Sequence, residues 1–286
     1  MNQEGQIREL AIIAGRGVYP RLLAESARKQ GVQRLLAVAF KGETDRVIEK
    51  HADEVQWLRL GKLDHLFDAL ESFGVKHVVM AGQIKPTHLF NVRMDKAMLS
   101  LLGRLQERNA HTIFGEITKE LNQRGMRVEQ ASLFMESAKP EPGLLGNRPP
   151  TDREQADIDL GLRVAKMTSG LEIGQTVVIK EGTILAVEAF EGTDDAIDRA
   201  GRLGGPGAVV VKVAKRGHDM RFDIPVVGEH TFKRLKKIRA STLAVEAGRT
   251  ILLEREKLMT LADRMGICFI AVRVEREGDR IHESEN

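Results

Sequence analysis

This chain predicts an α/β fold, with a parallel sheet in its first half and a second α/β domain after it. Two buried strand-like runs, Leu10–Ala14 and Arg34–Phe40, flank a helical segment, and the same alternation then repeats. Strands that are separated by a helix pair in parallel, with helices covering both faces of the sheet. Four prolines between Pro140 and Pro150 then divide the chain near its middle.

The elements of the first half follow from apolar periodicity and from the residues that end helices. A helix is expected from Pro20 to Gln30 because Gly31 follows it, and another from Leu63 to Phe73 because Gly74 follows it. The other segments are expected where apolar residues run without interruption or recur with helical spacing. These are strands at 55–60, 76–80 and 127–130 and helices at 95–108 and 112–123.

The second half predicts a domain of its own. Its first helix is expected from Arg153 to Thr168, because Thr151 and Asp152 favour a helix start. Strands are expected at 176–180, 184–188, 208–213, near 243 and at 267–274, and helices at 229–240 and 254–265. The expected organisation is therefore an N-terminal domain at 1–137, a Pro-rich linker at 138–150 and a C-terminal α/β domain at 151–286.

Composition indicates a globular protein in a reducing compartment. At 286 residues with 42% hydrophobic residues, the chain can form two ordinary cores. Its apolar runs are much shorter than a membrane span and its first residues are polar, so we expect a cytoplasmic protein. Cys268 is the only cysteine, and its apolar surroundings in the sequence favour a buried filler over a disulfide, a nucleophile or a zinc ligand.

The charge pattern argues against nucleic acid as a partner. The net charge is only +3, and aromatic residues make up 4% of the chain, which leaves few side chains on which bases could stack. The basic run Lys233–Arg239 is expected to be a solvated helix face. The alternative is that this run approaches anionic lipid headgroups, because clustered Lys and Arg are attracted to a negative membrane surface.

Opposite charges are concentrated between residues 187 and 223. Such a mixture is costly to desolvate unless a cation and an anionic ligand fill the space between the charges. A divalent cation such as Mg²⁺, together with a phosphate ligand, would satisfy both sets. The carboxylates are Glu188, Glu191, Asp194, Asp195, Asp219 and Asp223, and the basic residues are Lys212, Lys215, Arg216 and Arg221.

Some of these carboxylates have a structural alternative. Thr193 can cap a helix, and Asp194 and Asp195 in the first turn of that helix would complement its dipole without touching a ligand. Glu188 and Glu191 bracket an apolar pair on a segment that should be mostly buried, where an unpaired carboxylate is unfavourable. The candidate metal ligands are Asp223, Glu188, Glu191 and Asp194.

A second candidate site lies in the loops after the strands at 10–14 and 76–80. Gly15 and Gly17 allow a tight turn and a close approach to a phosphate at the start of the following helix. Pro20 stands where a dinucleotide fingerprint has its third glycine, so a redox cofactor is not expected. Gln83 could hydrogen-bond a base or ribose, and Lys85 could neutralise a phosphate at the same sheet edge. An ordinary turn or loop surface is the alternative for each.

Four segments in combination resemble one known family. They are 14–20 (AGRGVYP), 174–178 (GQTVV), 186–194 (AVEAFEGTD) and 221–225 (RFDIP). The family is the UDP-2,3-diacylglucosamine pyrophosphatase of the lipid A pathway that is unrelated to the calcineurin-like enzymes. The resemblance implies a Rossmann-like N-terminal domain, a distinct α/β C-terminal domain and a divalent metal, usually Mg²⁺. The implied reaction is hydrolysis of the diphosphate to UMP and 2,3-diacylglucosamine 1-phosphate.

The resemblance also implies roles for individual residues. Asp223, in the Arg-x-Asp-x-Pro element, is the residue implied to be essential, and the expected catalytic set is completed by Lys215 and Asp219. Substrate binding is expected from Gly15, Gly17, Gln83, Lys85, Lys212 and Arg221. One departure precedes that element: members of the family commonly have Lys-Pro-x-Gln-Asp, whereas residues 215–219 of this chain are KRGHD.

The two acyl chains of such a substrate require apolar surface. Apolar side chains of the linker region could line a trough for them or serve as ordinary packing; they are Leu133, Phe134, Met135, Leu144 and Leu145. The family implies a homodimer, and peripheral contact with the cytoplasmic face of the inner membrane would accompany the lipid substrate. The alternatives are an enzyme acting on another nucleotide sugar and a non-catalytic nucleotide sensor.

Overall fold

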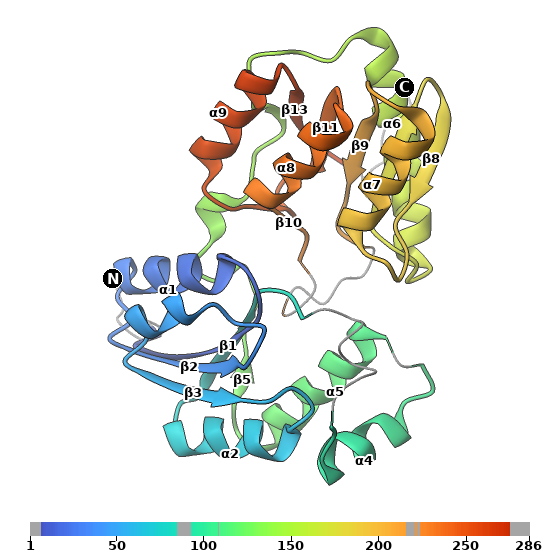
Figure 1. The fold of residues 1–286 in the computed structure, drawn as a ribbon. Helices are drawn as coiled ribbons and strands as arrows, with labels where there is room; N and C mark the ends of the chain where they lie inside the picture. Colours follow the sequence, from blue (N-terminus) through green and yellow to red (C-terminus); the bar gives the residue numbers. More distant parts are fainter. Residues whose placement is uncertain (1–6, 85–92, 108, 216–220, 222–223, 275–286) are drawn as a thin grey trace, which may run out of the picture. The chain divides into compact units, whose positions relative to one another are not determined.

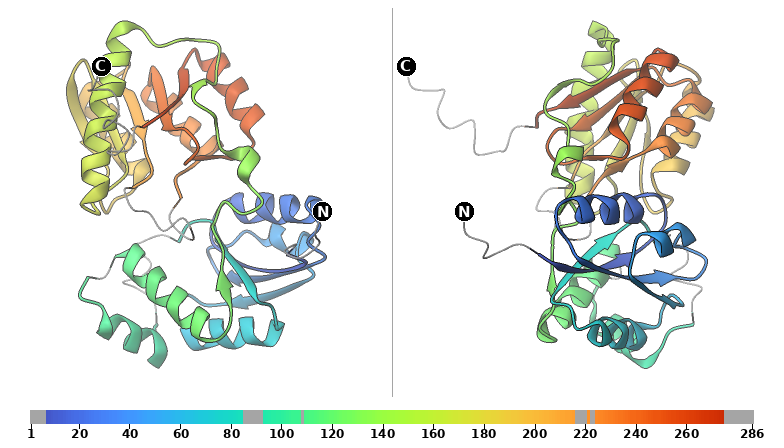
Figure 2. Two further views of the ribbon diagram at one scale, coloured as in Figure 1. Left: turned by 180° about the vertical axis from the view of Figure 1, so that it is seen from behind. Right: turned by 90° about the vertical axis from the view of Figure 1, so that its left-hand side faces the viewer.

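A computed structural model of the protein describes residues 7–84, 93–107, 109–215, 221 and 224–274. The chain forms two compact units with a boundary between Glu136 and Ser137, and Arg221 and Ile224 belong to the first unit. Each unit has its own main sheet with helices packed on it (Figures 1 and 2). The predicted α/β class, with a parallel sheet in the first half, is confirmed. None of the helices in these ranges has the length and apolar character needed to cross a bilayer.

The first unit is built on a parallel sheet with the strand order β3-β2-β1-β4-β5. The order reverses between β1 and β4, and open α/β sheets bind ligands at the carboxyl edge beside such a reversal. The strands are β1 (Glu9–Ala14), β2 (Arg34–Phe40), β3 (Glu54–Leu58), β4 (His77–Ala81) and β5 (Arg127–Val128). The helices are α1 (Tyr19–Lys29), η1 (Arg46–Lys50), α2 (Leu63–Phe73), α4 (Lys96–Arg104) and α5 (Ala110–Gln123).

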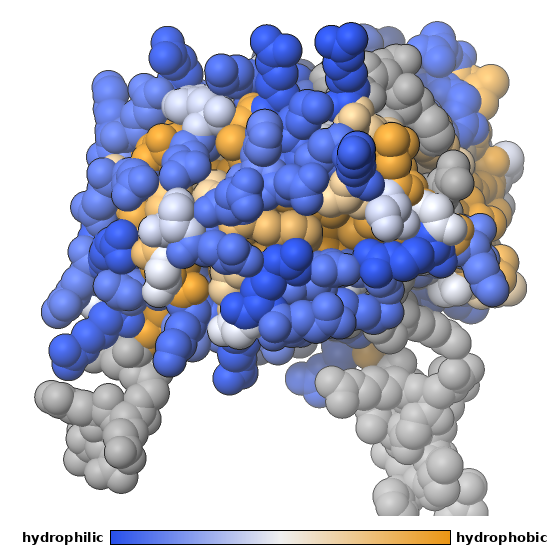
Figure 3. All heavy atoms as spheres, turned by 90° about the horizontal axis from the view of Figure 1, so that it is seen from below, coloured by the Kyte–Doolittle hydropathy of each residue, from blue (hydrophilic) through white to orange (hydrophobic). Residues whose placement is uncertain are grey.

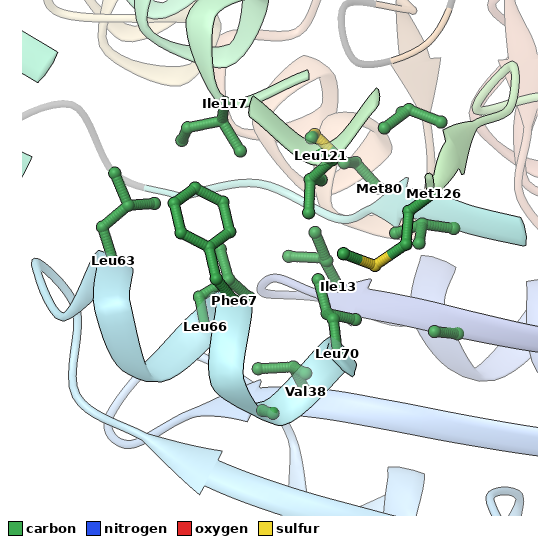
Figure 4. Close-up of a cluster of buried hydrophobic side chains, with 14 of the residues drawn as sticks. Ile13, Val38, Leu63, Leu66, Phe67, Leu70, Met80, Ile117, Leu121 and Met126 are labelled. Carbon is green, nitrogen blue, oxygen red and sulfur yellow. The ribbon is translucent and has the colours of Figure 1, made fainter. Parts of the chain in front are cut away.

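The core of the first unit follows from the burial of its central strands. All residues of β1 after Glu9 are buried, so alternate side chains face helices on opposite sides of the sheet. On one side, Leu63 and Phe67 of α2 point toward Ile117 of α5 and toward the sheet (Figure 4). α1 covers the other side (Figure 1). α2 ends where predicted, because Gly74 adopts the left-handed conformation with φ +67°.

The second unit contains a mixed sheet with the order β6-β13-β11-β9-β7-β8. Its strands β9, β11 and β13 are parallel, whereas β7 runs antiparallel to both neighbours and β6 runs antiparallel to β13. The strands are β6 (Gly143–Leu144), β7 (Thr176–Lys180), β8 (Thr183–Val187), β9 (Val209–Lys212), β11 (Thr242–Glu246) and β13 (Cys268–Val272). Two short strands, β10 (Val226–Val227) and β12 (Ile251–Leu252), pair separately.

Helices cover both faces of this second sheet. α6 (Asp152–Gly170) packs on one face, with Ile158 and Ala165 against alternate residues of β7 and β9. α7 (Thr193–Gly204), α8 (Glu229–Ile238) and α9 (Arg255–Met265) pack on the other, around Phe232 and Phe269. α6 begins with a capping box, in which the Thr151 and Glu154 side chains each bind the other residue's backbone amide. The helix start signalled by Thr151 is thus confirmed.

The Pro-rich segment makes regular contacts within the second unit. Gly143 and Leu144 form β6 against Ala271 and Ile270 of β13. Before this strand, the Gly248 amide donates to Pro140 O at 2.8 Å. Much of this segment is thus fixed by backbone pairing at the edge of the second sheet. η2 (Glu136–Ala138) spans the boundary between the units.

Candidate functional site

In the first unit, the loops after β1 and β4 are joined by their backbones. The Gly15 amide donates to Ala81 O at 2.7 Å. Arg16 and Gln83 exchange two hydrogen bonds, at 2.7 Å from the Arg16 amide and at 3.2 Å from the Gln83 amide. A Cβ atom on Gly15 would lie 2.7 Å from Gln83 O, which is closer than such atoms approach. Gly15 is therefore required where the two loops meet.

This pairing changes what the glycine motif can offer a ligand. The amides of Arg16 and Gln83 already donate within the protein, so neither is available to a phosphate. Gly17 has a different role, because its φ of +92° belongs to a left-handed turn and a Cβ there would meet nothing within 4 Å. Of the predicted binding residues, the structure brings Gly15 and Gln83 together, with Gly17 on the same loop. Lys85 lies outside the described residues.

Arg16 and Glu43 are polar residues of this edge that the sequence reasoning missed. The Arg16 Nε atom lies 3.4 Å from Glu43 Oε2, and the Glu43 side chain is almost fully buried whereas that of Arg16 is 41% exposed. Thr44 fixes the loop that carries Glu43, since its hydroxyl donates to Ala14 O and accepts from the Phe40 amide. The result is a partly exposed guanidinium held at the sheet edge. The sequence feature that could have identified Arg16 is its position as a basic residue between Gly15 and Gly17.

In the second unit, a chain of hydrogen bonds joins Lys212, Thr193 and Glu188. Lys212 ends β9 and is buried, and its Nζ donates to Thr193 Oγ1 at 3.0 Å. The Thr193 hydroxyl donates in turn to Glu188 Oε1 at 2.9 Å. Glu188 follows directly after β8, and β8 and β9 both pair with β7. The structure therefore brings together Glu188 and Lys212, two of the predicted site residues, through a hydroxyl that links their charges.

The role expected for Thr193 is corrected by this geometry. The residue that caps α7 is Gly192, with φ +86° and no side-chain cap, and Thr193 is the first residue of the helix. Its hydroxyl binds Glu188 and Lys212, and the helix start has no side-chain cap. Ser and Thr at a helix start are ordinarily caps, so local sequence alone favoured the wrong partner.

Glu191 and Asp194 are bound to basic residues on α7 and α8. Glu191 Oε1 accepts from Arg199 at 2.5 Å. Burial by itself raises the pKa of Glu191, but the hydrogen bond and the charge of Arg199 together with backbone hydrogen bonds outweigh it, and the pKa lies below its ordinary value. Asp194 Oδ2 lies 2.6 Å from His230 Nε2 and 3.9 Å from Arg234 Nε. Glu191 and Asp194 are therefore paired with basic residues and do not take part in the hydrogen-bond chain of Lys212, Thr193 and Glu188.

The fit of a metal ion depends on the atoms that remain unpaired. Glu188 Oε2 is buried and has no hydrogen-bond partner among the described residues. An orphaned carboxylate oxygen fits a hard cation such as Mg²⁺, which uses one or two carboxylates together with waters and substrate oxygens. Within the same described ranges, no three His, Cys, Asp or Glu side chains gather closely enough to hold a metal. Asp219 and Asp223 lie outside those ranges.

A buried ion pair lies next to this site on the same sheet edge. Lys166 Nζ donates to Glu246 Oε2 at 2.6 Å and to Ala214 O at 2.7 Å. The same carboxylate oxygen accepts from the Ala214 amide at 2.8 Å. Both backbone groups of Ala214 are thus held just after β9, where the chain continues to Lys215.

Two further predicted site residues, Lys215 and Arg221, lie apart from Glu188. Lys215 binds Glu172 Oε2 at 2.5 Å. Arg221 is half-buried in the first unit.

These features define a two-domain α/β protein whose polar side chains gather at the carboxyl edges of both main sheets, which is where α/β enzymes bind their ligands. The chain belongs to the LpxI family. The model of the LpxI N-terminal domain matches residues 9–138, and that of the LpxI C-terminal domain matches residues 141–270.

The chain is also similar to a named relative and to a solved structure. The UDP-2,3-diacylglucosamine pyrophosphatase LpxI of Caulobacter vibrioides is 28% identical over 279 residues, which cover 93% of this chain and 98% of the relative. The biotin carboxylase domain of Hydrogenobacter thermophilus 2-oxoglutarate carboxylase covers 68% of this chain and 40% of its own, at 12% identity. Its TM-score of 0.27 is too low to support any argument.

Proposed function

We propose that the protein hydrolyses the diphosphate of UDP-2,3-diacylglucosamine, giving UMP and 2,3-diacylglucosamine 1-phosphate in lipid A biosynthesis. The observation that carries this proposal is that both halves of the chain match the LpxI family, and that the C. vibrioides relative named for this activity aligns over 98% of its length. A match over both domains is needed because the predicted site residues come from both halves of the sequence.

The second part of the proposal concerns Mg²⁺. Glu188 and Asp223 would hold the ion, with Glu191 and Asp194 as further candidates if their pairs with Arg199 and His230 open. The bound ion would neutralise charge on the diphosphate and lower the pKa of a water molecule. The orphaned Glu188 Oε2 is the observation that favours this assignment, because a buried carboxylate oxygen without a partner is unfavourable unless a cation reaches it.

The protein's own residues would bind and orient the substrate around this ion. Lys212 would place its ammonium group beside the diphosphate oxygens, and Thr193 would keep that ammonium and the Glu188 carboxylate at a fixed separation. Lys215 and Arg221 would neutralise further oxygens, with Asp219 and Asp223 near the reacting phosphorus. In the first unit, Arg16 and the loop at Gly15–Gly17 would contact the nucleotide end.

Two assembly properties belong to the same proposal. A homodimer follows from the resemblance to the family. Contact with an anionic membrane surface would use the basic residues of α8, although Arg234 and Lys237 both bind Asp198, at 2.8 and 2.7 Å. These ion pairs leave less positive charge for lipid than the sequence run suggests. Sedimentation velocity tests the dimer, and co-sedimentation with anionic vesicles tests the membrane contact.

UMP release is the measurement that tests the reaction. Purified protein is incubated with UDP-2,3-diacylglucosamine in Mg²⁺ and in EDTA, and the same assay is run with Glu188→Gln and with Glu181→Gln, which changes an exposed carboxylate of the same unit. The proposal expects metal-dependent release that E188Q lowers at least about 100-fold and E181Q leaves unchanged. Turnover of other UDP-sugars without the lipid would indicate a different nucleotide-sugar enzyme, and binding without turnover a sensor.

A further inference from the structure

Lys166 and Glu246 are charged side chains in a place where charges are rare. Charged groups ordinarily lie at the surface, and Figure 3 shows this for the face of the first unit with α2, α4 and α5, where hydrophilic side chains surround the apolar ones. Met135 and Leu145, which were candidates for a lipid trough, are buried like other apolar residues. In the described part of the chain, the buried lysines are Lys166 and Lys212. Buried charge is therefore an informative feature of the second unit.

The Lys166–Glu246 pair takes over from strand pairing at the end of β9. β9 pairs with β11 as far as Lys212. The amide of Val213 then donates to the backbone just before β7, at 3.0 Å. Ala214 comes next, and its amide donates to the Glu246 carboxylate while its carbonyl accepts from the Lys166 ammonium group. The two side chains thus hold the chain one residue beyond its backbone pairing.

Each residue from Lys212 to Lys215 is held by a contact with another part of the second unit. Lys212 Nζ donates to Thr193 at the start of α7, and Lys215 Nζ donates to Glu172 Oε2 just after α6. The Lys215 side chain is only 12% exposed. A segment that leaves a strand is usually among the less ordered parts of a domain. This segment instead keeps two ammonium groups at fixed places.

The helix α6 determines much of this arrangement. Lys166 lies in its C-terminal part, and Glu172 follows its end by two residues. The same helix packs on β9 through Ile158 and Ala165. The helix that supports the strand therefore also sets the path of the chain where that strand ends.

Stability alone does not explain a buried ion pair. Two charges lose their hydration when they are buried, and apolar side chains of similar volume often stabilise a fold equally well. Position is different, because the pair binds both hydrogen-bonding groups of Ala214 and so fixes the direction of the backbone at that residue. A displacement of about 1 Å in a reacting group can lower a rate about 100-fold. Fixing the backbone beside a catalytic side chain is therefore a function that packing does not supply.

We infer that Lys166 and Glu246 are positioning residues for Lys215; this inference rests on the proposed function, in which Lys215 neutralises oxygens of the diphosphate. The pair fixes Ala214, and the backbone of Ala214 sets the point from which the Lys215 side chain extends. Lys166 and Glu246 act through this neighbour and do not contact the substrate.

The first test separates position from stability. UMP release is measured in the double variant Lys166→Met with Glu246→Gln, K166M/E246Q, which leaves no charge buried at this place. It is also measured in Lys166→Arg, whose guanidinium group can donate both to Ala214 O and to Glu246. We expect kcat to fall at least about 10-fold in K166M/E246Q with KM within about 3-fold of wild type, and to stay within about 3-fold in K166R.

The matched control is Ile158→Ala. It opens a cavity under the same helix α6 and should destabilise the second unit at least as much as K166M/E246Q does. The neighbouring Asp157 binds the turn between β7 and β8, so this control lies at the end of the sheet opposite to Ala214. I158A should keep kcat within about 3-fold of wild type at a temperature where it is folded.

A labelling test follows the Lys215 ammonium group without any turnover. Acetic anhydride acetylates amines, and a buried amine that is hydrogen-bonded reacts slowly. Mass spectrometry at one fixed pH should show Lys215 reacting at least about 5-fold faster in K166M/E246Q, and within about 2-fold of wild type in K166R and I158A. Glu246→Gln alone should give a rise of about 2- to 3-fold. Lys233, which is 68% exposed, should react at the same rate in all of these proteins.

The labelling result distinguishes failure of this inference from failure of the proposed function. If wild type releases no UMP but Lys215 reacts faster in K166M/E246Q and not in I158A, the proposed function fails and the placement of Lys215 by the pair stands. A wild-type labelling rate in K166M/E246Q overturns the inference, and so do equal values of kcat in K166M/E246Q and I158A. If circular dichroism shows that the double variant does not fold, E246Q takes its place, and a wild-type labelling rate there overturns the inference.

Discussion

Replacing Lys166 by Met should destabilise the second unit far more than the loss of one surface charge. The Lys166 and Glu246 side chains are 9% and 5% exposed, and their charged atoms lie 2.6 Å apart. Without the ammonium group, Glu246 keeps a buried negative charge and Ala214 O loses a hydrogen bond. Breaking a buried pair on one side costs about 3 to 5 kcal/mol of unfolding free energy, and we expect a loss in that range.

The double variant K166M/E246Q isolates the electrostatic part of this loss. Gln at position 246 can still accept from the Ala214 amide, and no charge remains buried. The double variant should therefore be more stable than K166M, with a total loss of about 1 to 3 kcal/mol. Adding E246Q to K166M should thus recover about 2 kcal/mol of unfolding free energy, because the effects of changes at two side chains in direct contact are not additive.

The assay has to report on each unit by itself. Trp57 is the only tryptophan of the chain and lies in β3 of the first unit, so its fluorescence follows that unit during urea unfolding. Amide hydrogen exchange in peptides that cover β9 and β11 follows the second unit. We expect K166M to speed exchange there and to lower the Tm of the second unit by about 2 to 4 °C per kcal/mol.

Lys233→Met is the matched control, because Lys233 Nζ lies 3.1 Å from Glu229 Oε1 but the two side chains are 68% and 36% exposed. Its loss should stay below about 1 kcal/mol. If K166M costs no more than K233M, the Lys166–Glu246 pair does not hold the end of β9, and the reasoning about buried charge at this edge is wrong.

Three further predictions concern other parts of the molecule. Thr193→Val keeps the shape of the side chain but removes the link between Lys212 and Glu188, so kcat for UMP release should fall about 10- to 100-fold while the Tm changes by no more than about 3 °C. Gly15→Ala should lower the unfolding free energy of the first unit by about 1 to 3 kcal/mol in Trp57-monitored urea titrations, because its Cβ would meet Gln83 O; Gly115→Ala in α5, where a Cβ meets nothing within 4 Å, should not. Burial by itself raises the pKa of Glu154, but hydrogen bonds from Arg148 and the Thr151 backbone outweigh it and lower the pKa to about 2. A carboxylate whose pKa is lower in the folded protein than in the unfolded chain stabilises the fold at pH values above its unfolded pKa. The contribution of Glu154 should therefore be lost as pH falls from about 4.5 to about 2. E154Q should flatten this part of the curve of unfolding free energy against pH.

Local apolar pattern was sufficient to predict most of the regular elements. The strands β1 and β2 were expected at 10–14 and 34–40 and occur at Glu9–Ala14 and Arg34–Phe40, because an uninterrupted apolar run can only be satisfied by burial on both faces. α2 was bounded correctly by Gly74. The two-residue strands β6, β10 and β12 were not predicted, since they are too short to carry a pattern and exist only through pairing with distant segments.

The candidate site was predictable as a set of residues but not as a set of contacts. Glu188 and Lys212 were both identified from local charge, yet the hydroxyl that joins them was assigned to a helix cap. Lys166 and Glu246 carried no signal at all, because a Lys on an amphipathic helix and a Glu at a strand end are ordinary in sequence. They are 80 positions apart and meet only once the sheet has formed.

The order of apolar and polar residues along the chain therefore specifies which segments become helices and strands, since burial of an apolar face is decided within one element. The choice of partner for each charge depends on which elements become neighbours. Asp194 lies 36 positions from His230 and Glu191 lies eight positions from Arg199, and only the packed sheet and helices determine that these pairs form while Glu188 Oε2 stays unpaired among the described residues. Electrostatic partners are set by distance in space, which local pattern does not encode.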